Sequence, residues 1–148
     1  MRRRETWLSQ PPRRRVEIGL RVPTDLDVVE EAVDLVARHC VASGVPPRAA
    51  RFRVRVVLCE ALANAIIYGN KLDPTKRVDV RVDVEGGIVT LEVRDEGDGF
   101  DPSTVPDPTQ PGRIESEDGR GLFLIRQLVD EVSHNDRGNV ICMIMRRT

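Results

Sequence analysis

Residues 78–94 carry the clearest structural pattern in the sequence. Residues 78–84 alternate strictly between valine and charged residues, and residues 88–94 follow after the turn signal Glu85-Gly86-Gly87. A period of two places all apolar side chains on one face of a strand, and the two glycines suit a tight turn. The pattern predicts an antiparallel hairpin with one solvated face, so other elements of the chain must cover the opposite face.

The other periodic segments predict helices for that purpose. Residues 15–22 alternate like a strand, and helical spacing follows from Thr24, the expected N-cap, to near Gly44. A second, strongly apolar helix is expected from about residue 48 to 68 and should be central. The remaining elements are expected at about 120–130 (helix), 131–134 and 139–146 (strands). The predicted class is α+β, a two-layer sandwich of a mixed, mostly antiparallel sheet covered on one face by helices.

Length and charge restrict the possible functions. A chain of 148 residues corresponds to one domain, at roughly 150 residues per domain. The 23 basic and 24 acidic side chains leave a net charge of -1, which argues against a binder of nucleic-acid backbones. Aromatic residues make up only 3%, so base stacking is not expected either. Without any run of about 18 apolar residues, no membrane span is predicted.

The ends and the cysteines give three further expectations. Residues 1–14 are interpreted as a flexible basic tail and residues 15–148 as the folded domain. The start lacks the apolar segment of a signal peptide, so a cytoplasmic location is expected. The chain has an odd number of cysteines without CxxC spacing, namely Cys40, Cys59 and Cys142. This pattern predicts small buried thiols, and neither a disulfide framework nor a zinc site is expected.

The predicted central helix carries two polar residues one turn apart. Glu60 and Asn64 are separated by four positions, so their side chains share a face of an otherwise apolar helix. Burying a carboxylate and an amide is costly unless both have partners. The two residues form either a satisfied surface pair or a functional one. In the functional interpretation, the Asn64 carbonyl oxygen suits Mg²⁺ and Glu60 orients or deprotonates a hydroxyl.

Two glycine-containing segments come later in the chain. Residues 95–101 (DEGDGFD) follow a predicted strand, where Gly97 and Gly99 let a ligand approach the backbone and Asp95 can accept a donor such as an exocyclic amine. Residues 119–125 (GRGLFLI) place glycines at a helix N-terminus, whose free N–H groups suit an anion. Neither segment fits the spacing of an EF-hand, a Walker A loop or a Rossmann fingerprint. Taken singly, an acidic turn and a glycine-rich hinge without a ligand remain the alternatives.

The glycine- and proline-rich segment between these elements is longer than an ordinary connection, so residues 101–118 are predicted to form a lid. Three prolines lie between Pro106 and Pro111, and apolar residues are few. We therefore expect this lid to be disordered in the free protein.

Together and in this order, the three segments resemble the N, G1 and G2 boxes of the GHKL ATPase superfamily, named for gyrase, the heat-shock chaperone, histidine kinases and MutL. The phrases ALANAIIYGN, VRDEGDGFDP and GRGLFLIRQLVDEV are most similar to the bacterial anti-sigma factor serine/threonine kinases. The resemblance extends from about residue 16 to residue 146, nearly the whole chain. It implies the Bergerat fold of the GHKL ATPases.

The resemblance also implies roles for the N and G1 residues. Asn64 would coordinate Mg²⁺ bridging the phosphates of ATP, and Glu60 would be the catalytic carboxylate that activates a substrate hydroxyl. Asp95 would bind the adenine amino group, while Gly97 and Gly99 would shape the adenine pocket. These roles agree with the chemistry of phosphoryl transfer, which depends mainly on positioning and charge neutralisation.

In the G2 box, Gly119 and Gly121 would hold the phosphates together with the N-terminus of the following helix. Arg120 would either assist there or remain a solvated charge. Asn139 stands where many superfamily members have a threonine near the adenine. Its amide can make the same hydrogen bonds as a hydroxyl.

For the function, the resemblance implies an ATP- and Mg²⁺-dependent kinase. It would phosphorylate a serine or threonine of a small anti-sigma factor antagonist and would sequester a sigma factor, and family members often form homodimers. One alternative is a catalytically silent, nucleotide-binding anti-sigma factor or adaptor. Another is a detached ATP-binding lobe that works with a separate phosphoacceptor. Glu60 does not separate these functions, because hydrolases of the superfamily use the same carboxylate.

Overall fold

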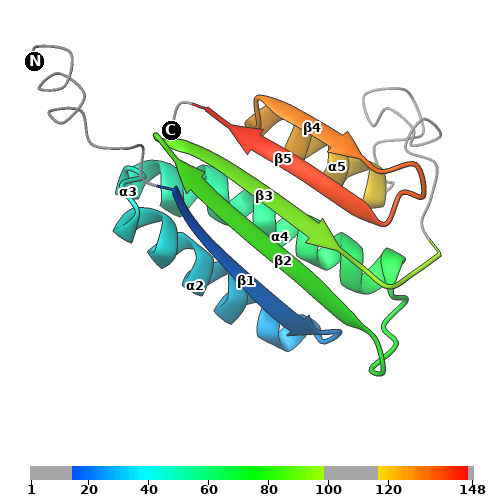
Figure 1. Ribbon diagram of the computed structural model, residues 1–148. Helices are drawn as coiled ribbons and strands as arrows, with labels where there is room; N and C mark the ends of the chain where they lie inside the picture. The colour runs from blue at the N-terminus through cyan, green and yellow to red at the C-terminus, as the bar shows by residue number, and fades with distance from the viewer. Residues whose placement is uncertain (1–14, 99–116, 147–148) are drawn as a thin grey trace, which may run out of the picture.

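Five strands form one sheet in the order β1-β2-β3-β5-β4 (Figure 1). The computed structural model describes residues 15–98 and 117–146. All strand pairings within these ranges are antiparallel. The strands are β1 (Arg15–Pro23), β2 (Arg77–Glu85), β3 (Ile88–Arg94), β4 (Glu131–His134) and β5 (Val140–Met145). The predicted α+β class is thus confirmed.

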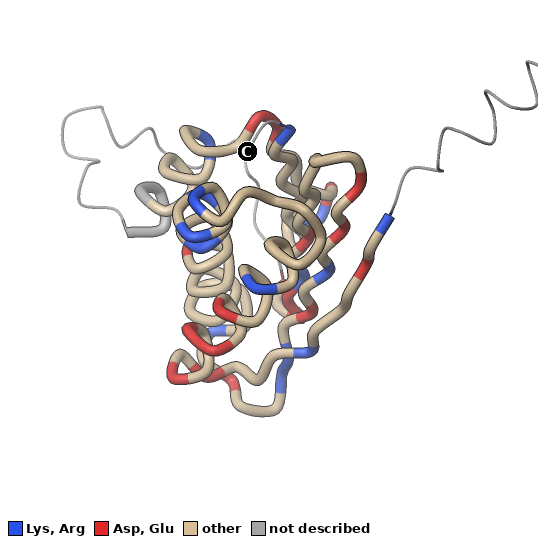
Figure 2. Tube along the Cα trace, turned by 90° about the vertical axis from the view of Figure 1, so that its left-hand side faces the viewer, with Lys and Arg blue, Asp and Glu red and all other residues tan. Residues whose placement is uncertain are grey.

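The helices cover one face of this sheet, and Figure 2 shows the two layers from the side. The helical elements are η1 (Leu26–Val28), α2 (Val29–Ala42), α3 (Pro47–Ala49), η2 (Ala50–Val54), α4 (Arg55–Asn64), η3 (Ala65–Gly69) and α5 (Glu117–Leu128). The segments α3 to η3 follow one another without a break and form the predicted central helix. Two of them, η2 and η3, are π-helical. No helix in the described part of the chain is long and apolar enough to cross a membrane.

The predicted hairpin is confirmed, and its alternation determines which face is covered. Val78, Val80, Val82 and Val84 are all buried against the helices. Fully burying one such side chain contributes ~1.5–3 kcal/mol relative to leaving it exposed. The turn needs its glycines, because Gly86 and Gly87 have φ angles of 57° and 80°.

The buried side of the central helix lies over the sheet. Val57, Leu58, Ala61 and Leu62 of α4 are buried in the main core, so Glu60 and Asn64 are left on a different side of the helix. Packing of the apolar residues thereby fixes the orientation of Glu60 and Asn64, although neither residue belongs to the core.

Two local predictions were wrong. Thr24 is not an N-cap: the side chain of Asp25 accepts the N–H of Asp27 at 2.9 Å, while Thr24 is buried and donates to the carbonyl oxygen of Lys76 at 2.6 Å. Nor are all thiols buried. Cys59 is exposed, whereas burial raises the pKa of Cys40 to about 11. Because Cys59 lies on the side of α4 that faces away from the sheet, its exposure follows from the orientation of the helix.

Candidate functional site

Glu60 and Asn64 line a cavity of about 290 Å³ together with Ala63, Ile67, Tyr68, Gly121 and Leu124. Both polar residues are half-buried. Within the described part of the chain, neither side chain has a hydrogen-bond or ion-pair partner. The carboxylate and the amide line the same cavity.

Gly121 brings α5 against this pair. A Cβ atom at this position would lie 3.0 Å from both Asn64 Nδ2 and Glu60 Oε2. Such a distance is tighter than ordinary packing, so the absence of a side chain allows the start of α5 to approach α4 this closely. Two segments that are far apart in the sequence, the predicted N and G2 boxes, thereby meet in space.

The start of α5 differs from the prediction. The helix begins at Glu117, earlier than the expected start at about residue 120, so Gly119 lies within its first turn instead of preceding it. Gly119 and Arg120 are thus placed in α5, but their surroundings lie outside the described residues. Gly99, the tail at 1–14 and residues 101–116 of the predicted lid also lie outside them.

Asp95 stands at the end of β3, in a turn fixed by main-chain bonds. Its N–H donates to the carbonyl oxygen of Asn139 at 2.9 Å, and the Asn139 side-chain amide donates back to the Asp95 carbonyl oxygen at 3.2 Å. The carboxylate oxygen Oδ1 accepts the N–H of Gly97 at 2.8 Å. The structure thus places Asn139 next to Asp95, through contacts to the main chain of Asp95.

The environment of Asp95 suits a carboxyl group that meets a ligand. Burial raises the pKa of this carboxyl above its usual value and outweighs the opposing effects of the Gly97 N–H group, Lys76 and Arg137. Loss of water from a half-buried carboxylate strengthens the demand for a hydrogen-bond donor. An exocyclic amine of a bound base would meet that demand.

Gly69 is a site residue that the sequence did not reveal. A Cβ atom on Gly69 would overlap the carboxyl group of Asp95, and one on Gly97 would overlap the carbonyl group of Gly69. The end of η3 therefore packs directly against the Asp95 turn. In the sequence, Gly69 is indistinguishable from an ordinary glycine at a helix end, because its partner lies 26 positions later.

The oxygen atoms at the cavity fit a magnesium ion. Mg²⁺ prefers oxygen ligands, keeps several waters and commonly takes only one or two ligands from the protein. The Asn64 carbonyl oxygen and the Glu60 carboxylate match this preference. In residues 15–98 and 117–146, no group of three or more His, Cys, Asp or Glu side chains could hold a metal. A divalent ion here would take most of its ligands from phosphate and water.

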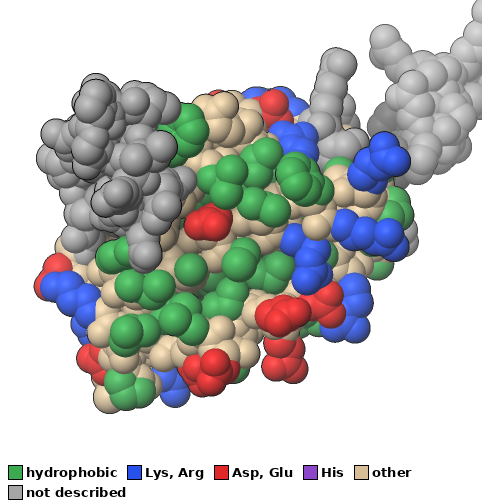
Figure 3. All heavy atoms as spheres, turned by 180° about the vertical axis from the view of Figure 1, so that it is seen from behind, with side chains coloured by type: hydrophobic (Ala, Val, Ile, Leu, Met, Phe, Trp, Pro, Cys, Tyr) green, Lys and Arg blue, Asp and Glu red, His purple; other side chains and the backbone are tan. Residues whose placement is uncertain are grey.

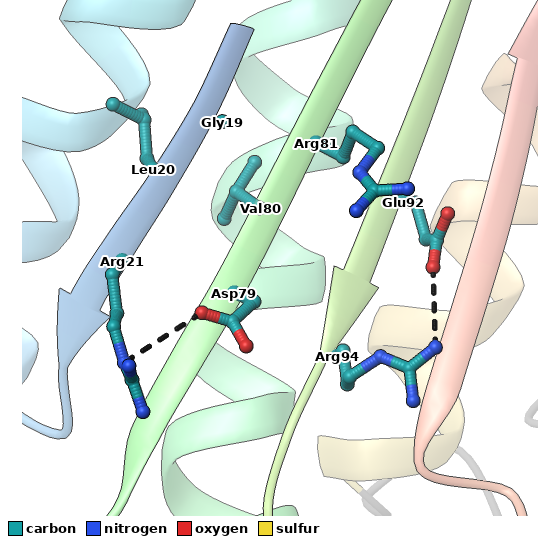
Figure 4. Close-up of a pocket in the computed structure, with 8 residues that line it drawn as sticks. All are labelled: Gly19, Leu20, Arg21, Asp79, Val80, Arg81, Glu92 and Arg94. Atoms are coloured by element: carbon teal, nitrogen blue, oxygen red, sulfur yellow. Dashed lines mark ion pairs between the residues drawn. The ribbon is translucent and has the colours of Figure 1, made fainter.

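The opposite face of the sheet offers a different hollow, of about 300 Å³, over β1, β2 and β3 (Figure 4). Arg21 and Asp79 pair across it at 3.9 Å, and Arg94 pairs with Glu92 at 3.6 Å. No predicted site residue lines this hollow. The cavity of Glu60 and Asn64 lies instead among the helices α4, η3 and α5, and Figure 3 shows an extensive apolar surface on the helical side of the molecule.

Comparison with known proteins shows which family the chain matches. A family profile described as "Histidine kinase-like ATPase domain" matches residues 22–145. The chain is 38% identical over 81 residues to the anti-sigma F factor of Geobacillus stearothermophilus, which covers 53% of this chain and 56% of that protein. It is 25% identical over 99 residues to the serine-protein kinase RsbW of Oceanobacillus iheyensis, covering 63% of each. The chain thus spans about half the length of the curated relatives it matches.

Proposed function

The chain belongs to the histidine kinase-like ATPase domain family, and on this premise we propose that it is an ATP-dependent protein kinase acting on serine or threonine. Its substrate would be a small anti-sigma factor antagonist, and it would also sequester a sigma factor. The relatives named anti-sigma F factor and serine-protein kinase RsbW support both halves of the proposal.

The observation that carries the proposal is the approach of Gly121 to Glu60 and Asn64. This contact gathers a carboxylate, an amide oxygen and, through Gly121 and Leu124, the second turn of α5 around one cavity. Helix N-termini favour phosphate, because their N–H groups are unpaired and the helix dipole is positive there. The three groups are those that transfer of a phosphoryl group to a hydroxyl requires.

Each residue would have a separate task. Glu60 would orient the substrate hydroxyl and accept its proton as the oxygen attacks the γ-phosphate. Asn64 would hold Mg²⁺ through its carbonyl oxygen, and the ion would neutralise charge on the phosphates when bound. Asp95 would accept the adenine amino group and thereby fix the other end of the nucleotide. Gly97, Gly99, Gly119, Arg120 and Asn139 remain proposed nucleotide-binding residues on the family resemblance.

The direct test is transfer of label from γ-labelled ATP to candidate antagonist proteins of the same genome in the presence of Mg²⁺. We expect labelled serine or threonine with the unmodified chain. Glu60→Gln should bind ATP yet lose transfer by at least about 100-fold, the usual contribution of a general base. Glu92→Gln, on the opposite face of the sheet, is the matched control and should transfer normally.

Two outcomes would contradict the proposal. Transfer that survives in Glu60→Gln would remove the role of Glu60 as the base. ATP binding without transfer to any candidate would instead support the alternative of a catalytically silent, nucleotide-binding anti-sigma factor or adaptor.

A further inference from the structure

The end of the central helix contains a fully buried asparagine. Asn70 is 0% exposed, although asparagine is mostly found at protein surfaces. Its main-chain N–H closes η3 by donating to the carbonyl oxygen of Ala65 at 2.7 Å. Burying a side-chain amide costs free energy unless its polar atoms are hydrogen-bonded. The hydrogen-bond partners of Asn70 therefore indicate its structural role.

The side chain of Asn70 makes hydrogen bonds in two directions. Nδ2 donates to Thr24 Oγ1 and to the carbonyl oxygen of Arg77, both at 3.0 Å. These bonds join the end of β1 to the start of β2. In the other direction, Oδ1 accepts the main-chain N–H of Glu96 at 2.7 Å. The Nδ2 donor thus links β1 to β2, and the Oδ1 acceptor binds the turn that contains Asp95.

The bond to Glu96 bears directly on Asp95. On one side, the N–H of Asp95 is held by the carbonyl oxygen of Asn139 at 2.9 Å. On the other side, the Asn70 bond holds the peptide plane that immediately follows Asp95. With both adjoining peptide planes held, the direction of the Asp95 Cα–Cβ bond is set, and the Gly97 N–H at 2.8 Å from Oδ1 orients the carboxylate. The tight contact of Gly69 with Gly97 seats this turn on the helix end.

We propose that Asn70 is a positioning residue that determines specificity for adenine. Through the Glu96 N–H, it holds the turn that carries the Asp95 carboxylate, the proposed acceptor of the 6-amino group. The inference rests on the proposed function, in which Asp95 accepts the amino group of ATP. Asn70 itself does not touch the nucleotide in this arrangement.

A matched pair of variants separates positioning from simple stability. Asn70→Ala removes the bond to Glu96 together with the two scaffold bonds. Thr24→Val removes a scaffold bond of Nδ2 and the bond to Lys76, but leaves the bond to Glu96 in place. Both variants leave buried polar atoms without partners, so both should lower the free energy of unfolding.

The readout is affinity for ATP and for ITP, in which an oxo group replaces the 6-amino group, measured calorimetrically on the full chain. We expect Asn70→Ala to weaken ATP binding by about tenfold, the equivalent of about 1.4 kcal/mol, and to reduce the preference for ATP over ITP by a similar factor. Thr24→Val should keep both the ATP affinity and the preference within about twofold of the unmodified chain, because Asp95 stays in place. Loss of stability alone would not alter the ATP-to-ITP ratio.

Equal effects of the two variants on the ATP-to-ITP ratio would overturn the inference. Should Asn70→Ala not fold, hydrogen exchange of the Glu96 amide in the unmodified chain decides: slow exchange supports the bond to Asn70, and exchange at the rate of a free amide overturns it. If the unmodified chain binds neither nucleotide, the proposed function fails and this inference fails with it. If the unmodified chain prefers ATP and the variants do not differ, only the role of Asn70 is refuted.

Discussion

Gly69 and Gly97 meet at the Asp95 turn, yet substitution should affect them differently. A methyl group on Gly97 would collide with the main-chain carbonyl group of Gly69, which cannot move without shifting the end of η3. We expect Gly97→Ala to lower the free energy of unfolding by about 1–3 kcal/mol, as overpacking does. A methyl group on Gly69 would collide with the Asp95 carboxyl group, which can rotate away. Gly69→Ala should therefore remain folded but lose ATP affinity by about tenfold.

Urea unfolding and calorimetric ATP binding measure the two effects. Gly19→Ala is a suitable control, because a Cβ atom there would approach nothing closer than the Val80 carbonyl oxygen at 3.9 Å. This control should change neither quantity. Normal ATP affinity in a folded Gly69→Ala variant would show that the Asp95 carboxylate does not contact the nucleotide.

The buried carboxyl group of Asp95 should make stability depend on pH. Because burial raises its pKa in the folded state, ionisation of Asp95 opposes folding at neutral pH. Asp95→Asn removes that charge and keeps an oxygen to accept the Gly97 N–H. We expect this variant to be more stable than the unmodified chain at pH 7. The advantage should shrink as the pH falls through the raised pKa towards the unfolded value of about 3.9.

Thermal unfolding of both chains between about pH 4 and 8 tests this sign, since this window begins near the usual pKa of an aspartate and extends above it. Asp98→Asn, at an exposed position in the same turn, is the matched control. A stability difference that does not change with pH would mean that Asp95 is not destabilised by burial.

The residues that could be identified from the sequence were those whose chemistry conflicts with their local pattern. Glu60 and Asn64 stand out because they are polar on an apolar helix, and Asp95 because it ends a strand before glycines. Gly69 and Asn70 give no such signal. Their roles arise from contacts with residues 95–97, which the chain reaches only after a complete hairpin.

At the scale of elements, hydrophobic periodicity predicted each strand and helix of the described ranges, but not the irregularities within them. The π-helical segments η2 and η3 are invisible to periodicity, because an i+5 bond adds a residue without changing which residues are apolar. They lie on either side of α4. The segment η3 ends at Gly69, so this irregular turn determines where the helix end meets the Asp95 turn.

Arg53 of η2 fixes the other end of α5. Its Nε and Nη2 atoms donate to the Leu128 carbonyl oxygen at 2.9 and 2.7 Å, and Asp130 lies 3.7 Å from Nη2. Carbonyl groups at a helix C-terminus lack partners within the helix, so this guanidinium serves as the cap. We expect Arg53→Met to lower the free energy of unfolding by about 1–3 kcal/mol, typical of hydrogen bonds to charged groups. The amides at the end of α5 should exchange faster.

Arg53→Lys distinguishes the cap from the charge. Lysine keeps the positive charge near Asp130 but cannot reproduce the two-pronged contact with one carbonyl oxygen. If urea unfolding shows Arg53→Lys to be as stable as the unmodified chain, the ion pair matters and the cap does not.

At the scale of the whole molecule, charge balance determines how a triphosphate can be held. The sequence has 23 basic and 24 acidic side chains and a net charge of -1, so no overall field attracts an anion. Many of the described charges are already paired at the surface, as between Arg15 and Asp83 at 2.9 Å. Under the proposed function, the phosphates of ATP would be neutralised locally, by Mg²⁺ at Asn64 and by main-chain N–H groups of α5.

Because the charge of the phosphates would be neutralised locally, we expect the affinity for ATP, but not the affinity for adenosine, to depend on Mg²⁺. Removing the ion with EDTA should weaken ATP binding by at least about tenfold, because the ion would supply a double positive charge at the phosphates. Adenosine, which would contact only the Asp95 end, should bind within about twofold of its affinity in Mg²⁺. In Asn64→Ala, ATP affinity should already be low and should respond little to EDTA. Equal ATP affinity with and without Mg²⁺ in the unmodified chain would instead place the phosphates wholly on main-chain donors, leaving Asn64 without its proposed ion.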